Sequence, residues 1–582
     1  MPFHIRYFAL LQSRSVHLVT IMVLCVAAVL PFLYWGIPSG HDFEIHMYSW
    51  MDALGQWREG IIYPRWAPSA HWGYGEPRFL FYPPVSWMLG AALGSVLPWK
   101  IVPGVYCWLA LALAGAGMYR LAERWLRPSD ALFAAIFYAL NPYHLLVIYW
   151  RSAYAELLGA GLLPLLVLAV AKLADENLRP VPWLSLILAA SWLVNVPVAV
   201  MLHYSAAGLA LFIAVREKSA RPLVRLGAAV LLGAGLAAIY LLPAIYEQRW
   251  VHIGEVLSPG VRPQDNFLFT KNMDPDHDHF NLLVSLVGAT EMVVLAYAIW
   301  ASRKKRTGNN VWMAAALWGV ASALAMFRFS NFLWEHLPEF RFTQLPFRWL
   351  LCVNVPTAFL LAMAGGGRGK WRWMVRGFVS IVLLATLVVG GWRTQLPWWV
   401  TADDIKQMRQ SVADGRGNEG VDEYVPVAAD PYQLNKNLPR VSDGTGARIE
   451  GEDDAGLGAS EPAASETSPS KSADTNLLNV QIERWAATDK KFRVLAKGRW
   501  KVLLRLFNYP AWEAMVNGQP VAIETTEETG LMVIPVQAGE SEVEIRFTRT
   551  VDQWAGTGIS VFSVMVLAFG WSWTRTASGG NA

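Results

Sequence analysis

Long runs of apolar residues recur along most of the chain, separated by short polar stretches. A helix needs about 20 consecutive apolar residues to cross the hydrocarbon core of a bilayer. Proline disfavours helix in the residue before it, so we divide one long run at Asn195-Val196-Pro197. The pattern predicts an all-α polytopic membrane protein with about twelve spans, at 17–37, 101–121, 131–149, 157–173, 181–196, 197–215, 223–243, 281–300, 311–327, 347–364, 375–391 and 555–573.

Basic residues fall in every second loop between these spans, as the positive-inside rule requires when the N-terminus is cytoplasmic. The C-terminus is then cytoplasmic as well, and loops 38–84, 244–280, 328–346 and 392–554 are extracytoplasmic. The short apolar segment 85–97 breaks the alternation if it is a span, so we interpret it as an interfacial helix. The basic residues that carry this assignment are Arg120, Arg124, Arg127, Lys172, Arg179, Arg216, Lys218, Arg221, Arg225, Arg303, Lys304, Lys305, Arg306, Arg368, Lys370, Arg372, Arg376 and Arg575.

The region before the last span leaves the membrane pattern. Within residues 392–475, the stretch 410–475 is rich in Gly, Ser, Ala, Asp and Glu, which predicts a loop and linker with some disorder. From 476 to 553, short runs such as 501–507, 531–536 and 543–547 alternate with turn signals such as Asn517-Gly518, which predicts a small β-sandwich. The predicted organisation is a transmembrane domain at 1–391, the linker at 392–475, the β-rich domain at 476–553, and a final span with its tail at 554–582.

Composition agrees with this class. The chain is 54% hydrophobic and 16% charged, whereas soluble proteins carry about 25% charged residues. Many of the 29 Trp lie near the ends of apolar runs, as in an aromatic belt. The basic clusters are interrupted by hydrophobic stretches, so no continuous basic face for nucleic acid is expected. The three cysteines all lie in apolar runs, which indicates core packing rather than disulfides.

The first extracytoplasmic loop opens with the polar run Gly40-His41-Asp42-Phe43-Glu44-Ile45-His46. In a helix, Asp42 and His46 share a face while Glu44 points elsewhere. A carboxylate there could accept a proton from a sugar hydroxyl. The Asp42–His46 pair could instead hold a divalent cation, or the acids could simply favour a solvated helix N-terminus.

The same loop continues with an unusual density of Pro, Gly and aromatic residues up to Tyr82-Pro83-Pro84. This composition is typical of a rigid loop that is partly immersed in the membrane. Arg65 and Arg78 lie within it and could bind a lipid phosphate, as guanidinium groups do well. They could equally contact bulk headgroups.

Several segments, in their order along the chain, resemble the bacterial GT-C-type membrane glycosyltransferases, and most closely the "6-pyruvoyl-tetrahydropterin synthase related" membrane domain of YfhO-like proteins. The pterin label does not describe chemistry, because nothing in the chain resembles a soluble pterin synthase with zinc-binding histidines. The resemblance extends over nearly the whole length and is carried by residues 40–84, 149–156, 195–197, 342–349, 507–518 and 536–540.

The resemblance implies a GT-C-like fold in the bacterial cytoplasmic membrane and a polyprenyl-phosphate-linked sugar as donor. It also implies an acidic active-site residue in the first outer loop, and Asp42 occupies that place. The acceptor implied is an extracytoplasmic glycan, lipid or protein. Asp42 is followed by Phe43-Glu44 rather than by a plain Asp-x-Asp, so dependence on a divalent cation stays open.

Other ionisable residues lie near the predicted outer ends of spans. Arg151 and Glu156 either pair with each other, or bind the donor phosphate and the sugar respectively. Arg348 is a second candidate for the phosphate. Asn195 is expected to cap a turn, Glu247 follows the seventh span, and Asp278 and His279 could bind metal or lie in a solvated loop.

These observations predict a glycosyltransferase in which Asp42 deprotonates or orients an acceptor hydroxyl that attacks the anomeric carbon with inversion. Arginines from among Arg65, Arg78, Arg151 and Arg348 are expected to stabilise the lipid phosphate. The predicted substrate-binding residues are Glu44, His46, Arg65, Arg78, Tyr82, Arg151, Glu156, Asn195, Glu247 and Arg348. The alternative is a lipid or polysaccharide transporter or an assembly factor, which would carry polar residues at the bilayer midplane.

Overall fold

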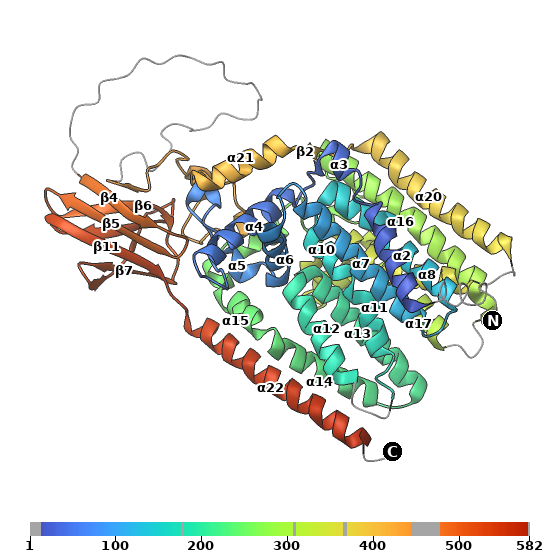
Figure 1. The fold of residues 1–582 in the computed structure, drawn as a ribbon. Helices are drawn as coiled ribbons and strands as arrows, with labels where there is room; N and C mark the ends of the chain where they lie inside the picture. The colour runs from blue at the N-terminus through green and yellow to red at the C-terminus, as the bar shows by residue number, and fades with distance from the viewer. Residues whose placement is uncertain (1–12, 176–179, 306–309, 365–368, 444–477, 580–582) are drawn as a thin grey trace, which may run out of the picture.

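The computed structural model describes residues 13–175, 180–305, 310–364, 369–443 and 478–579 (Figure 1). These residues form a large helical body that carries a β-rich domain at one end, and a last helix that runs back along the body. The helices are α2 Arg14–Val26, α3 Phe32–Trp35, α4 Phe43–Arg58, α5 Arg78–Phe81, α6 Pro84–Val96, α7 Val102–Ala122, α8 Pro128–Ala139, α9 Pro142–Leu146, α10 Tyr154–Ala160, α11 Leu162–Val170, α12 Pro180–Val194, α13 Val196–Glu217, α14 Arg221–Leu236, α15 Ala238–Glu247, α16 Pro275–Ser302, α17 Asn310–Leu324, α18 Asn331–His336, α19 Leu350–Met363, α20 Lys370–Thr394, α21 Ala402–Ala413 and α22 Val551–Gly579.

Every predicted span coincides with a helix or with consecutive helices. In the described residues, seven helices are long and apolar enough to cross a membrane. The number rises to nine if α14 with α15 and α17 with α18, which bend by 77° and 96°, each form one span. The three remaining runs form shorter apolar helices, in α2, α10–α11 and α12, so the count of twelve stays a prediction. The expected interfacial segment 85–97 forms α6, which packs against α4 and α7.

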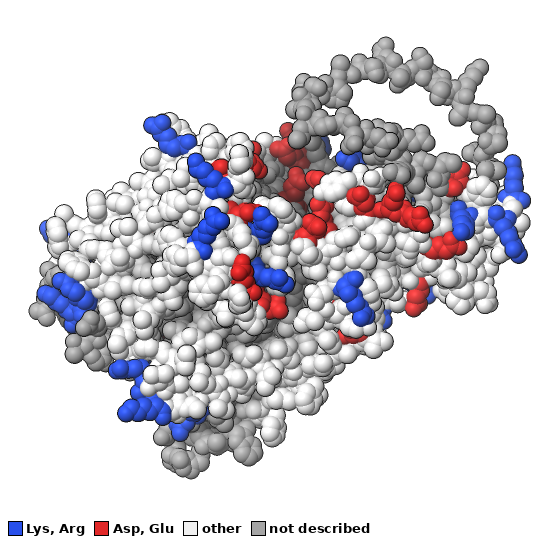
Figure 2. All heavy atoms as spheres, turned by 180° about the vertical axis from the view of Figure 1, so that it is seen from behind, with Lys and Arg blue, Asp and Glu red and all other residues white. Residues whose placement is uncertain are grey.

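The predicted basic loops lie together at the end of the body that is remote from the β-rich domain. Arg14 pairs with Glu123, Arg216 donates to Asn310 over 3.2 Å, and Arg372 lies 3.3 Å from Asp130. Figure 2 shows Lys and Arg side chains at that end, acidic residues gathered nearer the β-rich domain, and a broad uncharged surface between them. Which side of a membrane this end faces stays a prediction. Arg179, Arg306 and Arg368 lie outside the described residues.

Two antiparallel sheets form the β-rich domain, as the alternating pattern predicts. One has the order β3-β6-β10-β9 and the other β4-β5-β11-β7-β8. Apolar residues from both sheets share one core, so the domain is a sandwich. The Asn517-Gly518 turn joins β7 to β8 with positive φ at both residues. The strands are β3 Val441–Ser442, β4 Leu478–Trp485, β5 Asp489–Ala496, β6 Trp500–Phe507, β7 Trp512–Val516, β8 Gln519–Val521, β9 Glu524–Thr525, β10 Leu531–Val536 and β11 Gly539–Phe547.

The first part of the predicted loop and linker at 392–475 contains a short strand and a helix, which the sequence reasoning did not predict. Strand β2 (Trp399–Val400) pairs with β1 (Ile37–Pro38), and α21 follows with a capping box formed by Thr401 and Asp404. This capping box is a start signal that the sequence carried, but the polar composition of the segment obscured it. Residues 444–477, where disorder was expected, lie outside the described residues.

The first loop is held between the helical body and the β-rich domain. Trp66 packs in the sandwich core, with its ring 5.4 Å from Trp512 and 5.6 Å from Phe547. From the segment after α21, Asn418 donates its backbone N–H to the carbonyl of Ser69 over 2.8 Å. The loop therefore forms part of a folded interface and is not an isolated surface excursion.

Candidate active site

Asp42 stands immediately before the first turn of α4, and its position is fixed by the end of another helix. Its backbone N–H donates to the carbonyl of Arg151 over 2.9 Å. Two residues earlier, Gly40 N–H donates to Ser152 Oγ over 2.9 Å. The backbones approach so closely here that a Cβ on Gly40 would lie 2.4 Å from the carbonyl oxygen of Trp150. A glycine is therefore required to bring Asp42 to Arg151.

A four-residue charged cluster surrounds this point. Arg151 Nη2 lies 3.8 Å from Asp42 Oδ2, and Arg151 also pairs with Glu156. Glu156 accepts a further bond from Arg348 Nε over 3.0 Å and one from Tyr143 Oη over 2.6 Å. The pairing of Arg151 with Glu156 is thus confirmed, and Arg348 joins it from a distant part of the chain. Glu156 and Arg151 are 1% and 2% exposed, whereas the side chain of Asp42 is 34% exposed.

His46 lies on α4 one turn after Asp42, in aromatic surroundings. Its ring centroid lies 5.1 Å from that of Tyr154 and 5.8 Å from that of Tyr82. Burial lowers the pKa of His46 to about 4, so the imidazole is neutral at physiological pH. Its Nε2 is buried and has no partner among the described residues. Glu44 is exposed.

The four metal candidates do not converge. No group of three or more His, Cys, Asp and Glu side chains that could hold a metal ion occurs within the described residues. Asp278 instead accepts the backbone N–H of Asn272 over 2.8 Å, and His279 is exposed at the start of α16. Within the described residues, Asp42 and His46 thus form no such group with a third His, Cys, Asp or Glu, and a divalent cation at this site stays a prediction through which we derive no chemical step.

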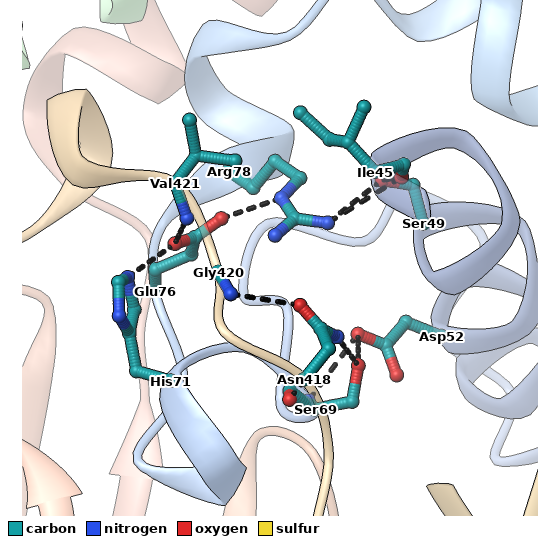
Figure 3. Close-up of polar contacts among 10 residues, drawn as sticks. All are labelled: Ile45, Ser49, Asp52, Ser69, His71, Glu76, Arg78, Asn418, Gly420 and Val421. Carbon is teal, nitrogen blue, oxygen red and sulfur yellow. Dashed lines mark hydrogen bonds and ion pairs between the residues drawn. The ribbon is translucent and has the colours of Figure 1, made fainter. Parts of the chain in front are cut away.

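Three predicted site residues lie away from Asp42's cluster or are bonded elsewhere. Arg78 is fully buried, 2.5 Å from Glu76 and 3.0 Å from Ser49 Oγ (Figure 3). Arg65 lies in a separate cavity of about 100 Å³ that Arg549 also lines. Glu247 is buried and accepts bonds from Tyr509 Oη (2.5 Å), Thr550 Oγ1 (3.1 Å) and Gln553 Nε2 (2.8 Å), which join α15 to the β-rich domain and α22.

Asn195 is a helix cap, as expected, and does not reach the cluster. Its Oδ1 accepts the backbone N–H of Val198 over 3.1 Å at the start of α13. We expect Asn195→Ala to lower the free energy of unfolding by about 1 kcal/mol, the usual cost of losing such a cap. Thermal unfolding of purified protein measures this change, and Asn195→Asp, which can still cap, is the matched control. Loss of activity in Asn195→Ala protein that is still folded at the assay temperature would contradict a purely structural role.

The sequence reasoning missed a buried polar group in the middle of a span. Glu291 lies in α16 and is 1% exposed. Its carboxylate accepts the backbone N–H of Tyr143 over 3.2 Å and Asn354 Nδ2 over 3.0 Å. Tyr143 thus bonds Glu291 through its backbone and Glu156 through its hydroxyl. A glutamate inside the apolar run 281–300 was the available signal, because ionisable residues at membrane depth are rarely accidental.

Comparison with known proteins places the chain in a family. A model of the 6-pyruvoyl-tetrahydropterin synthase related domain, described as a membrane protein, matches residues 79–396. No curated protein matches the chain.

Two solved structures show a weaker likeness. The arabinofuranosyltransferase AftD from Mycobacteria is 16% identical with a TM-score of 0.44, over 66% of this chain and 28% of AftD. The oligosaccharyltransferase AglB from Archaeoglobus fulgidus, solved with an inhibitory peptide and dolichol-phosphate, is 13% identical with a TM-score of 0.41, over 71% of this chain and 59% of AglB. The chain therefore spans less than two thirds of either protein, and likenesses at these TM-scores carry no argument about function. The family model, by contrast, matches more than half of the chain, so this chain belongs to the 6-pyruvoyl-tetrahydropterin synthase related family of membrane proteins.

Proposed function

We propose that the protein transfers a sugar from a polyprenyl-phosphate carrier to an acceptor on the extracytoplasmic side, with Asp42 as the catalytic base. The observation that carries the proposal is the pairing of a partly exposed carboxylate with a buried guanidinium, 3.8 Å apart, at one end of an apolar helical body. The acid can take the proton that the acceptor hydroxyl loses. The arginine can stabilise the negative charge that develops on the departing phosphate. The resemblance of residues 40–84 to GT-C enzymes supports the same assignment.

The proposed reaction is a single displacement. The acceptor hydroxyl attacks the anomeric carbon as the bond from that carbon to the phosphate oxygen breaks, which inverts the configuration. The hydroxyl proton passes to the Asp42 carboxylate, and the lipid phosphate leaves as an anion. Because phosphate is already stable as an anion, the site needs positive charge near the leaving oxygen rather than a strong general acid.

Arg151 and Arg348 are the proposed partners of the departing phosphate. Both pair with Glu156, and Arg151 also lies 3.8 Å from Asp42, so these two guanidinium groups belong to the same charged cluster as the proposed base. Arg78 is occupied by Glu76, and Arg65 belongs to a different cavity. Asp42 does not line the cavity that contains Arg65. It also does not line a second cavity, of about 220 Å³, that lies between α4 and the β-rich domain. We therefore expect bound donor and acceptor to complete the walls of the reaction site.

A second candidate function is transport of a lipid-linked glycan. The buried Glu291, near the middle of the 28-residue helix α16, is the observation that favours it, because transporters place polar groups at the bilayer midplane. Its carboxylate accepts the backbone N–H of Tyr143 at the start of α9 and the side-chain amide of Asn354 in α19, so it also has a structural explanation as the group that holds the start of α9 against α19. Catalysis therefore remains our first proposal.

One experiment separates the two functions. Purified protein in lipid nanodiscs is incubated with a panel of radiolabelled polyprenyl-phosphate sugars and with extracted envelope glycan, and the bound lipids of the preparation are identified by mass spectrometry. Transfer predicts release of polyprenyl phosphate and a labelled product. A preparation that turns over no donor but retains a full-length glycan lipid overturns the transferase proposal and supports transport.

A further inference from the structure

A second cavity lies between the helical body and the β-rich domain. It encloses about 220 Å³ and is lined by the second half of α4, by loop residues 66–73, by residues 412–415 at the end of α21, by Arg440, and by the β4–β5 and β6 regions of the sandwich. Its walls come from five stretches of the chain, residues 51–73, 412–415, 440, 485–490 and 505–506, so only the docked domain creates it. In Figure 1 the region lies where α4 and α21 approach the β-rich domain.

The wall from α4 is polar. Asp52 accepts bonds from Ser69 Oγ over 2.7 Å and from Ser69 N–H over 3.3 Å (Figure 3). One turn later, Gln56 donates to the carbonyl of Trp66 over 2.9 Å. Gln56 is 1% exposed, yet its Oε1 has no hydrogen-bond partner among the described residues. A buried acceptor without a partner is costly, so a group entering the cavity gains by donating to it.

The opposite wall combines an aromatic ring with basic groups. Trp485 at the end of β4 is half-buried, and the guanidinium carbon of Arg440 lies 5.9 Å from its ring centroid. Arg440 forms no ion pair with any residue that the structure describes. Arg505 bonds backbone carbonyls through its Nη atoms, but its buried Nε has no partner there. Lys490 Nζ donates to the carbonyls of Ala486 and Ala487, so few of its N–H groups are left to bind a ligand.

We propose that this cavity binds a saccharide, and that the saccharide is part of the acceptor glycan; the second statement rests on the proposed function. A sugar ring has an apolar C–H face, which suits the half-buried Trp485. Its hydroxyls both donate and accept, which suits the mixture of Asp52 and Gln56 acceptors with Arg440 and Arg505 donors. A phosphate group fits less well, because Asp52 and Glu59 also line the cavity.

The position of the cavity agrees with an acceptor that extends from the reaction site. Asp42 lies just before α4 and Asp52 lies within it, ten residues later. This separation corresponds to about 15 Å of helix rise. Residues 46–54 of α4 are buried, so a short oligosaccharide that spans this distance would pass around the helix and not along it. The reacting hydroxyl would then lie near Asp42, and sugars further along the chain would lie against Trp485.

Binding is tested with purified full-length protein on an array of defined neutral, amino and uronic-acid oligosaccharides. We expect wild type to bind at least one class, and Trp485→Ala and Arg440→Gln each to weaken that binding at least tenfold. Trp554→Ala removes an exposed tryptophan of α22 outside the cavity and should bind like wild type. The proposal is overturned if no oligosaccharide binds, or if Trp485→Ala, shown to be folded by its thermal unfolding, binds unchanged.

A second measurement separates this inference from the proposed function. Slow hydrolysis of the donor by water requires Asp42 but not the cavity. We expect Trp485→Ala to raise the KM for the bound oligosaccharide class with donor hydrolysis unchanged, and Asp42→Asn to bind oligosaccharide normally while donor hydrolysis is lost. Saccharide binding without any donor turnover would support the cavity as a saccharide site and overturn only its assignment to an acceptor.

Discussion

Asp42→Asn is expected to lower sugar transfer on the order of 10²–10⁴-fold, the range that a positioned general base contributes. The amide has the same shape but cannot take up the hydroxyl proton. The fold should persist, because the carboxylate makes no capping hydrogen bond to α4 and its ion pair with Arg151 is long, at 3.8 Å. Turnover of a labelled polyprenyl-phosphate sugar by purified variant and wild type measures the effect.

Glu44→Gln is the matched control for that variant. It removes a carboxylate two residues away, in the first turn of α4, whose side chain is exposed and forms no ion pair with any residue that the structure describes. We expect it to transfer sugar at the wild-type rate. If Asp42→Asn also transferred sugar at the wild-type rate, Asp42 would not be the catalytic base. Its role would then be limited to starting α4.

Glu76→Gln is expected to lower the free energy of unfolding by about 3–5 kcal/mol, the cost of removing one partner from a buried charge pair. Glu76 is fully buried between Arg78, at 2.5 Å, and His71, at 2.8 Å, and it also accepts the backbone N–H of Val421 over 3.1 Å (Figure 3). Without its charge, the Arg78 guanidinium stays buried and uncompensated, and the segment after α21 is held less firmly. The thermal unfolding midpoint in detergent measures the loss.

The same pair gives the stability a defined dependence on pH. Burial by itself raises the pKa of Glu76, but Arg78 and His71 outweigh it and hold that pKa below its ordinary value of 4.5. A carboxyl with a lowered pKa stabilises the fold fully above its ordinary pKa, and this stabilisation is lost as the pH falls through the lowered value. Wild type should therefore lose stability in acid more steeply than Glu76→Gln does.

Glu524→Gln provides the comparison for both measurements. Its pair with Lys501 is exposed, with side chains 47% and 65% accessible, and such pairs contribute about 0–1 kcal/mol. We expect this variant to unfold within a degree or two of wild type and to keep the wild-type acid response. If Glu76→Gln were equally mild, the buried network would not be what anchors the first loop to the β-rich domain.

The helix positions followed from local pattern, since hydropathy over about 20 residues needs no knowledge of distant neighbours. The break at Asn195 was predictable because Pro197 and a capping side chain act within one turn. The strands of the sandwich were predictable from alternation, as in β5, where Phe492, Val494 and Ala496 are buried on one face. Helix α21 was missed because it is short and mostly polar, and a Gly- and Ser-rich stretch follows directly after it.

The sequence by itself determined that this chain is an apolar helical body with one β-rich insertion, and it named Asp42, Glu156 and four arginines, Arg65, Arg78, Arg151 and Arg348, among its site candidates. Only the tertiary structure decided that Arg348, 192 residues from Glu156, completes the cluster, while Arg78 is taken up by Glu76 and Arg65 lies elsewhere. The physical reason is the distance along the chain over which each kind of interaction acts. Hydrophobic periodicity is a local property of the chain, whereas the partner of a buried charge is set by which distant segments pack against it.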